Sequence, residues 1–246
     1  GSAALTLSGN NTYSGDTIIN TGTLQVSGTG QLGGGSYGGN ITNAATFLFA
    51  SNSSQSLTGI ISGAGALTKN GTGTLSLSGN NTYTGITTLR NGTISLDHEN
   101  GLGSGGNITF TGGALQYGTG ISTDISSRIK NSTSAILIDT NGNDISFAGV
   151  LGSTNTLGLT KNGTGTLSLL ESNIYTGATT INGGTLEITA TGLLGGGHYS
   201  GNITNKGNFL FGSDSNQTLS GIISNTGFLT KNGTGTLILS GNSTYS

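Results

Sequence analysis

Short runs in which apolar and polar residues alternate recur along the whole chain. The clearest are Ala4–Ser8, Thr23–Ser27, Gly73–Leu77, Thr93–Leu96, Ala135–Asp139 and Thr185–Thr189. A period of two places every second side chain on the same side of an extended strand. The pattern therefore predicts short β-strands, each with one side facing a core.

Turn-forming pairs separate these runs. Asn-Gly, Gly-Gly and Gly-Asn pairs stand between them, and Gly or Asn accepts the positive φ that a tight corner needs. The 246 residues include 48 Gly and no Pro, and 31% hydrophobic content in short alternating runs is more than a solvated coil carries. A folded all-β protein is the better interpretation than disorder.

Internal repeats are the strongest feature of the sequence. The nine residues Leu67–Leu75 recur unchanged as Leu159–Leu167 and Leu229–Leu237. Residues 5–84 also align without a gap with 167–246, at a constant offset of 162. Fixed periods of this kind are typical of solenoids, in which each repeat stacks on its neighbour.

The repeat lengths predict the architecture. Units 5–74 and 167–236 have 70 residues, unit 75–166 has 92, and 237–246 begins the next unit. Both lengths divide by roughly 23 residues, within the usual length of a solenoid turn, and unequal units argue against propeller blades. We therefore expect residues 1–246 to form a single segment of right-handed parallel β-helix with about ten to eleven coils.

Charge and composition exclude several classes of partner. The seven Lys and Arg are scattered singly and the formal net charge is −2, so no basic stripe is present for nucleic acid. No apolar run approaches the roughly 20 residues of a membrane-spanning helix, so we expect no membrane insertion by this segment. The absence of Cys excludes a disulfide framework.

The repeated phrase resembles a known family. Leu67–Gly85, with its Lys-Asn-Gly-Thr-Gly-Thr core, is similar to the passenger-associated strand repeat of bacterial autotransporters, as are Thr179–Leu186 and Leu102–Tyr117. The resemblance covers almost the whole chain. It implies a right-handed parallel β-helix that is exported through an outer-membrane barrel and forms the shaft of a large surface protein.

Enzymes are also built on β-helices, so clustered acids need attention. Asp97-His98-Glu99 is the only dense group, and a solvated loop is a better interpretation of it than a metal or acid/base site. A second set could converge across neighbouring coils, where structural ion pairing is favoured over catalysis: Asp124, Arg128, Lys130, Asp139 and Asp144.

The remaining candidates point to structure rather than chemistry. His198 stands where the matching repeat has Ser36, which argues against a ligand role. Asn-x-Ser/Thr triplets are expected by chance in a sequence this rich in Asn and Thr. The pairs Phe47/Phe49 and Phe209/Phe211 have the spacing of a core stack. No catalytic, cofactor-binding or metal-binding residue is predicted, and no cofactor is expected.

The sequence as a whole predicts a stalk or adhesin shaft on the bacterial surface or outside the cell, and not an enzyme. A glycan-binding or glycan-cleaving β-helix is the first alternative, and an ice or surface-lattice binder with a flat Thr array is the second. The expected partners are a host or cell-surface glycan or protein. Self-association through exposed strand edges at uncapped ends is a further expectation.

Overall fold

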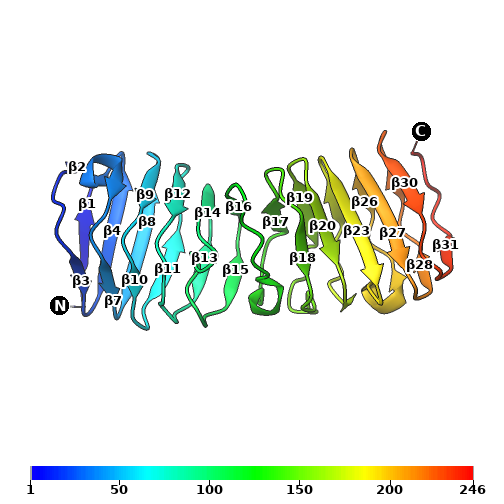
Figure 1. Ribbon diagram of the computed structural model, residues 1–246, viewed down its shortest axis with the longest axis horizontal. Coiled ribbons are helices and arrows are strands. Elements are labelled where there is room, and N and C mark those ends of the chain that lie inside the picture. The colour runs from blue at the N-terminus through cyan, green and yellow to red at the C-terminus, as the bar shows by residue number, and fades with distance from the viewer. Residues whose placement is uncertain (1, 246) are drawn as a thin grey trace. The chain divides into compact units, whose positions relative to one another are not determined.

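A computed structural model describes residues 2–245 and divides the chain into two compact units, one ending at Ile121 and the other beginning at Ser122. Both units consist of short parallel strands joined by tight corners (Figure 1). The expected all-β parallel solenoid is confirmed. The chain makes about 12 turns, slightly more than the ten to eleven predicted.

The described residues of the first unit form sixteen strands and one 3₁₀ turn. They are β1 Ala4–Leu7, β2 Asn10–Asn11, β3 Thr17–Ile19, β4 Thr23–Gly28, β5 Gln31–Leu32, η1 Gly33–Gly35, β6 Ser36–Tyr37, β7 Ile41–Asn43, β8 Thr46–Ser51, β9 Gln55–Leu57, β10 Ile61–Ser62, β11 Ala66–Lys69, β12 Thr74–Leu77, β13 Thr87–Leu89, β14 Thr93–Leu96, β15 Ile108–Phe110 and β16 Ala114–Tyr117.

The second unit continues in the same style. Its elements are η2 Ser126–Arg128, β17 Ile136–Asp139, β18 Ile145–Phe147, β19 Leu159–Asn162, β20 Thr166–Leu169, β21 Ser172–Asn173, β22 Thr179–Ile181, β23 Thr185–Ala190, β24 Leu193–Leu194, η3 Gly195–Gly197, β25 His198–Tyr199, β26 Ile203–Asn205, β27 Asn208–Ser213, β28 Gln217–Leu219, β29 Ile223–Ser224, β30 Phe228–Lys231 and β31 Leu237–Leu239.

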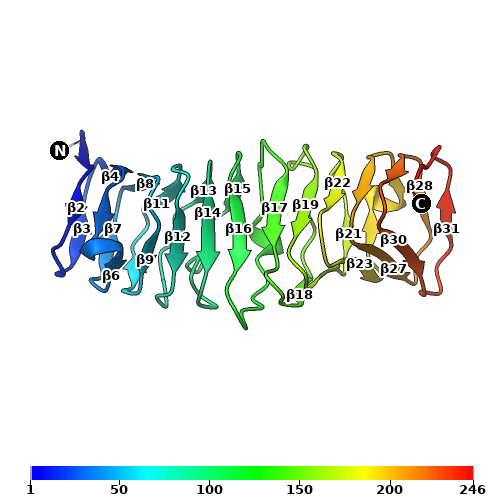
Figure 2. The same ribbon diagram turned by 90° about the horizontal axis from the view of Figure 1, so that it is seen from above.

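Three stacks of strands form the sides of each unit. In the first unit they are β1-β4-β8-β11-β13-β15, β6-β9-β12-β14-β16 and β3-β7-β10, and in the second β17-β19-β22-β26-β29, β18-β20-β23-β27-β30 and β25-β28-β31 (Figure 2). Every pairing described is parallel, and paired residues lie 19 to 24 positions apart, as in Ala4 with Thr23 and Thr179 with Ile203. One turn is therefore shorter on average than the 23 residues expected from the repeat lengths.

The core follows the alternation predicted from sequence. Leu24, Phe47 and Leu67 stack inward on three successive strands, and all are buried. Phe209 and Phe211 are fully buried in the second unit, so the predicted phenylalanine stacks are confirmed. The repeat leucines Leu75, Leu77, Leu167 and Leu169 are fully buried, whereas no further strand of the described chain covers β31, where Leu239 is 39% exposed.

The sequence repeat and the structural turn do not coincide. Leu5 and its repeat equivalent Leu75 lie in different stacks of the first unit, on β1 and β12. Leu167 and Leu237 likewise lie in different stacks of the second unit, on β20 and β31. A 70-residue unit therefore makes three full turns and then continues onto the next side of the solenoid. The prediction that each unit contains a whole number of coils was wrong.

Glycines form ladders where successive corners stack too closely for a side chain. In the first unit, a Cβ on Gly85 would lie 2.1 Å from the carbonyl oxygen of Gly65, and a Cβ on Gly106 would lie 1.8 Å from that of Gly85. Gly59 and Gly79 form part of a second ladder at another corner. The close approach of the backbones, and not an unusual φ, requires glycine at these positions.

At one corner, an alanine adopts a left-handed conformation that usually favours glycine. Ala190 has a φ of +54°, whereas its repeat equivalent Gly28 has +63°, and a Cβ on Gly28 would meet nothing within 4 Å. A left-handed conformation costs a residue with a Cβ roughly 1 kcal/mol. We expect Ala190→Gly to raise the free energy of unfolding by about 0.5–1 kcal/mol and Gly28→Ala to lower it by a similar amount. Urea denaturation checks both, and a loss of stability in Ala190→Gly would contradict the backbone explanation.

Candidate functional site and its relatives

In the first candidate group, Asp97 and His98 accept hydrogen bonds from residues two positions away. The Asp97 Oδ1 accepts a hydrogen bond of 2.6 Å from the Ser95 hydroxyl, and the His98 Nδ1 accepts one of 3.0 Å from the backbone N–H of Asn100. Among residues 2–245, no three His, Cys, Asp or Glu side chains come together in a way that could hold a metal ion. These contacts are those of a polar turn.

Two acids of the second candidate group, Asp124 and Asp144, join neighbouring turns. Asp124 accepts hydrogen bonds from the Ser126 backbone N–H (2.8 Å) and hydroxyl (2.6 Å), and from the backbone N–H of Ala148 one turn later (2.9 Å). Asp144 accepts from the backbone N–H of Thr166 (2.8 Å), and Asp139 from that of Asn141 (2.9 Å). The carboxylates therefore act as turn caps.

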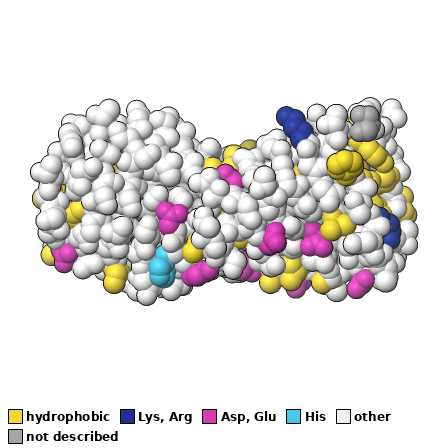
Figure 3. All heavy atoms as spheres, turned by 45° about the horizontal axis from the view of Figure 1, so that its top comes forward, with side chains coloured by type: hydrophobic (Ala, Val, Ile, Leu, Met, Phe, Trp, Pro, Cys, Tyr) yellow, Lys and Arg dark blue, Asp and Glu magenta, His cyan; other side chains and the backbone are white. Residues whose placement is uncertain are grey.

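Surface chemistry is sparse elsewhere. His198 is exposed on β25 and pairs with Thr218 of β28, as Ser36 pairs with Ser56 in the first unit. On the face drawn in Figure 3, most of the surface is neither charged nor hydrophobic, and the acidic side chains lie in separate spots. No helix among the described residues is long and apolar enough to span a membrane.

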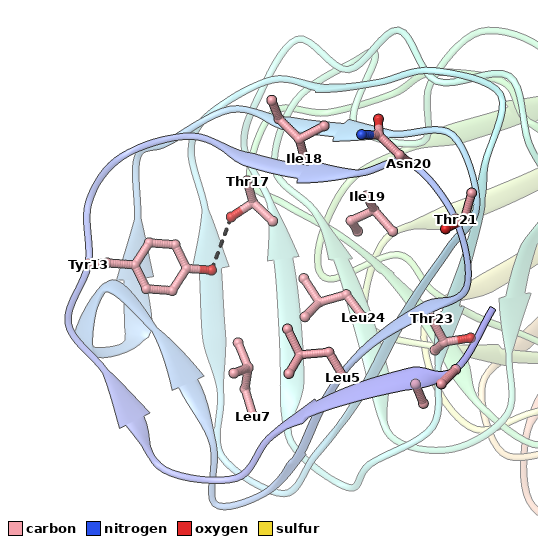
Figure 4. A pocket seen from close by; sticks show the side chains of 12 residues that line it. Leu5, Leu7, Tyr13, Thr17, Ile18, Ile19, Asn20, Thr21, Thr23 and Leu24 are labelled. Atoms are coloured by element: carbon pink, nitrogen blue, oxygen red, sulfur yellow. Dashed lines mark hydrogen bonds between the residues drawn. The ribbon is translucent and has the colours of Figure 1, made fainter. Parts of the chain in front are cut away.

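A cavity of about 610 Å³ opens at the first turn, between β1 and β3 (Figure 4). The Tyr13 hydroxyl lies 3.0 Å from the Thr17 hydroxyl, which lies 2.7 Å from that of Tyr37. Tyr13 is 40% exposed, whereas its repeat equivalents Tyr83 and Tyr175 are fully buried. The cavity is thus the interior of a turn that no described strand covers, and its lining has no acid or base for catalysis.

Two buried lysines are the main feature that the sequence interpretation missed. Lys69 and Lys161 occupy the same place in the nine-residue repeat, and both are fully buried. The Lys161 Nζ donates hydrogen bonds to the carbonyl oxygens of Asn162 (2.7 Å), Gly163 (2.8 Å) and Gly183 (3.1 Å). Each lysine stands two residues after a core leucine on the same strand, so its side chain points to the same side. This spacing could have predicted that the lysines are buried.

Lys69 has an equivalent environment. Its Nζ donates to the carbonyl oxygens of Gly71 and of Asn91 in the next turn, and lies 5.6 Å from the centre of the Phe49 ring. Burial lowers the pKa of both ammonium groups to about 8, and at Lys161 the charges of Asp139 and Asp144 oppose that shift. Each lysine thus ties two turns together through backbone carbonyls.

Buried amides make similar ties. The Gln55 side chain accepts from the Leu32 backbone N–H (2.7 Å) and donates to the Leu32 carbonyl (3.1 Å), and Gln217 repeats this with Leu194. Asn81 accepts from the Ile61 backbone N–H in the turn before and donates to the Gly101 carbonyl in the turn after, each at 2.7 Å. No buried side-chain nitrogen or oxygen of the described residues lacks a partner.

Comparisons with known proteins agree with this structure. Segments 1–26, 67–96, 159–188 and 229–246 match the passenger-associated-transport-repeat family. Over 92% of its length the chain is 37% identical to the adhesin BmaC autotransporter of Brucella suis biovar 1 (strain 1330), of which it spans only 8%. No solved structure matches. The chain belongs to the passenger-associated-transport-repeat family of autotransporter passenger regions.

Proposed function

We propose that the chain is part of the shaft of a surface-displayed bacterial adhesin, where it acts as a spacer and performs no catalysis. The observation that carries this proposal is that several of its carboxylates join one turn to the next. Asp124, Asp144 and Asp214 each accept a backbone N–H from the following turn. Contacts of this kind give these carboxylates a part in the stacking of turns.

The relative supports the adhesive setting. It is named an adhesin and an autotransporter, and it is far longer than this chain. Autotransporter passengers are displayed outside the bacterium, which places this chain at the cell surface or beyond it. Because turns contact only their neighbours, such a shaft is lengthened by adding repeats without redesigning a core.

The modular shaft is tested by deleting residues 75–166. Residue 74 then joins Leu167, the repeat equivalent of Leu75, so β20 takes the place of β12 beside β9 and every strand keeps a partner of the same type. We expect this variant to keep its β-sheet circular dichroism and to unfold cooperatively, with a denaturation midpoint near that of the parent chain.

The matched control removes residues 75–173, seven more than the first deletion. This variant lacks a third of a turn and breaks the stacking register, so we expect it to lose cooperative unfolding. Equal stability of the two variants would contradict a shaft built from exchangeable repeats. Release of reducing ends from polysaccharides by the parent chain would contradict the proposed lack of catalysis.

Exposed apolar strand edges predict that this chain associates end to end. Phe228 on β30 is 77% exposed, and Leu5 on β1 is 62% exposed. The repeat equivalent of Phe228 is Ala66. We expect light scattering to show concentration-dependent association that Phe228→Ala reduces at least threefold, because less apolar edge surface remains to be buried. A chain that stays monomeric at high concentration would contradict this prediction.

A further inference from the structure

The corner between β13 and β14 contains an asparagine-glycine pair whose reacting atoms lie together. The backbone N–H of Gly92 donates a hydrogen bond of 2.8 Å to Oδ1 of the Asn91 side chain. Within residues 2–245 this N–H has no other acceptor. Since Oδ1 is bonded to Cγ, the Gly92 nitrogen lies next to the carbon that it must attack for the pair to close into a succinimide ring, and such proximity speeds an intramolecular reaction.

A buried cation contacts the same peptide group. The Lys69 Nζ donates a hydrogen bond of 3.2 Å to the backbone carbonyl of Asn91, and a Cβ added to Gly92 would lie 2.7 Å from this Nζ. The Asn91 carbonyl and the Gly92 nitrogen belong to one amide. A nearby positive charge stabilises the negative charge that develops on an amide as its N–H is lost. Lys69 therefore makes the Gly92 nitrogen a better nucleophile.

The corner also gives access to the other reactants. Asn91 is exposed, so water reaches its side-chain amide and ammonia can leave. Gly92 has a φ of +66°, which glycine adopts readily, and it has no Cβ to hinder its nitrogen. Nucleophile, activating charge and solvent thus meet at one side chain.

Other Asn-Gly pairs of the chain lack this geometry. The chain contains seven such pairs, which begin at Asn70, Asn91, Asn100, Asn141, Asn162, Asn182 and Asn232. The backbone N–H of Gly71 approaches the carbonyl of Phe49 in the turn before, at 3.4 Å. The Asn162 Oδ1 accepts a hydrogen bond of 2.8 Å from the Asn182 side chain. The arrangement at Asn91 is therefore a property of its corner and not of the residue pair alone.

We propose that Asn91 is a self-modification site, at which the folded chain deamidates spontaneously. The Gly92 nitrogen forms a bond to Cγ of Asn91 and gives its proton to water, while the Cγ–Nδ2 bond breaks and Nδ2 leaves as ammonia. One water molecule then opens the succinimide at either carbonyl, which yields aspartate or isoaspartate at position 91. This inference goes beyond the spacer role and does not depend on it.

The buried lysine favours isoaspartate as the product. In isoaspartate the main chain runs through Cγ, and the former backbone carbonyl of Asn91 becomes a free carboxylate. That carbonyl already accepts from Lys69, whose other hydrogen-bond acceptor is the neutral carbonyl of Gly71. The modification therefore gives the buried ammonium a counter-charge, and charge-assisted hydrogen bonds are stronger than those to neutral acceptors.

The second unit contains the same corner without the reacting side chain. Gly183 stands 92 positions after Asn91, and Gly184 has a φ of +62°. The Lys161 Nζ donates to the Gly183 carbonyl at 3.1 Å. A Cβ on Gly183 would lie 3.3 Å from the Gly163 carbonyl oxygen, so a small adjustment accommodates a side chain. We expect Gly183→Asn to create a second self-modification site.

The test incubates the full 246-residue chain in a mildly alkaline buffer made with heavy-oxygen water. Peptide mapping by mass spectrometry then follows the exchange of amide for labelled acid at each Asn-Gly pair, and electron-transfer fragmentation separates isoaspartate from aspartate. In the folded chain we expect Asn91 to deamidate about tenfold faster than Asn70 and Asn162. In urea the three rates should become similar, because the corner geometry is lost.

Two lysine variants separate activation from simple loosening of the corner. Lys69→Met should slow deamidation of Asn91 by about threefold, whereas the matched control Lys231→Met, whose lysine is exposed, should leave it unchanged. Faster reaction in Lys69→Met would overturn the role of the lysine. Circular dichroism establishes that each variant is folded before rates are compared.

The remaining outcomes also decide the proposal. A folded parent chain in which Asn91 reacts no faster than Asn70 overturns the self-modification site. A folded Gly183→Asn chain that stays unmodified at position 183 overturns the requirement for the lysine-bound corner, even if Lys69→Met fails to fold. Aspartate as the sole product at position 91 overturns the pairing of an isoaspartate carboxylate with Lys69.

Discussion

Replacing Gly106 by alanine is expected to lower the free energy of unfolding by about 3 kcal/mol, because overpacking against a backbone that cannot move costs at the upper end of such changes. The new Cβ would lie 1.8 Å from the Gly85 carbonyl oxygen and 2.3 Å from its carbon. Relief requires the two turns to separate, which weakens the parallel pairing on either side of the corner. Urea denaturation measures the loss, and hydrogen exchange locates it.

Gly9→Ala is the matched control, since a Cβ at Gly9 meets nothing within 4 Å and its φ is not in the left-handed region. We expect it to change stability by less than about 0.5 kcal/mol. Faster exchange in Gly106→Ala should be concentrated in β13 and β15, the strands that flank the corner. Similar effects of the two substitutions would mean that the glycine ladder is not what sets the spacing of the turns.

Replacing Lys161 by methionine is expected to lower the free energy of unfolding by about 2 kcal/mol at pH 7. Methionine fills a similar volume but leaves the carbonyls of Asn162, Gly163 and Gly183 without their shared donor. The exposed copy, Lys231, donates only to Gly233 at 2.7 Å. Lys231→Met should therefore change stability by less than about 0.5 kcal/mol and serves as the matched control.

The effect of Lys161 should also depend on pH. Its folded pKa of about 8 is below the ordinary value of 10.5, so between these values the unfolded chain binds more protons and stability rises with pH. Between pH 8 and 10 we expect the free energy of unfolding of the parent chain to rise by about 1–2 kcal/mol for each buried lysine. In Lys161→Met the contribution of Lys161 to this rise should be absent. A pH profile identical to that of the parent would contradict burial of the ammonium.

Buried tyrosines limit the pH range over which stability rises. Burial raises the pKa of Tyr175 well above 10 and that of Tyr199 to about 12. Above pH 10 the unfolded chain therefore releases tyrosine protons that the folded chain retains, and stability falls as pH rises. Chemical denaturation across pH 7 to 11 should show a maximum near pH 10.

The strand pattern was readable from sequence because it depends on local alternation. Phe47 and Phe49 are two residues apart in a strand, so both had to face the same side. The number of residues in a turn was harder to predict, because it is set by how tightly corners such as Gly85 and Gly106 stack. The predicted turn was about two residues too long. Over three turns this error accumulates to about a third of a turn, so the move of the repeat from one side of the solenoid to the next was missed.

Residue type alone did not reveal which buried side chains form hydrogen bonds between neighbouring turns. A lysine is almost never fully buried unless its charge is satisfied. Residue type therefore argued against burial of Lys69, although its position in the strand faces the core. Its partners are backbone carbonyls, which no side-chain motif reveals. The acids at Asp97 and Asp124 were singled out because carboxylates can act in catalysis, but whether they cap backbone N–H groups depends on corners whose shape the sequence does not specify.

The shift of the repeat by one side has an immunological consequence. In the first unit, the outward residues beside Leu5 and those beside Leu75 belong to related sequences on different stacks. An antibody raised against one of these segments would meet its second epitope on another side of the same unit. A repetitive antigen of this kind therefore presents related epitopes in several directions, and blocking one side leaves the others open to recognition.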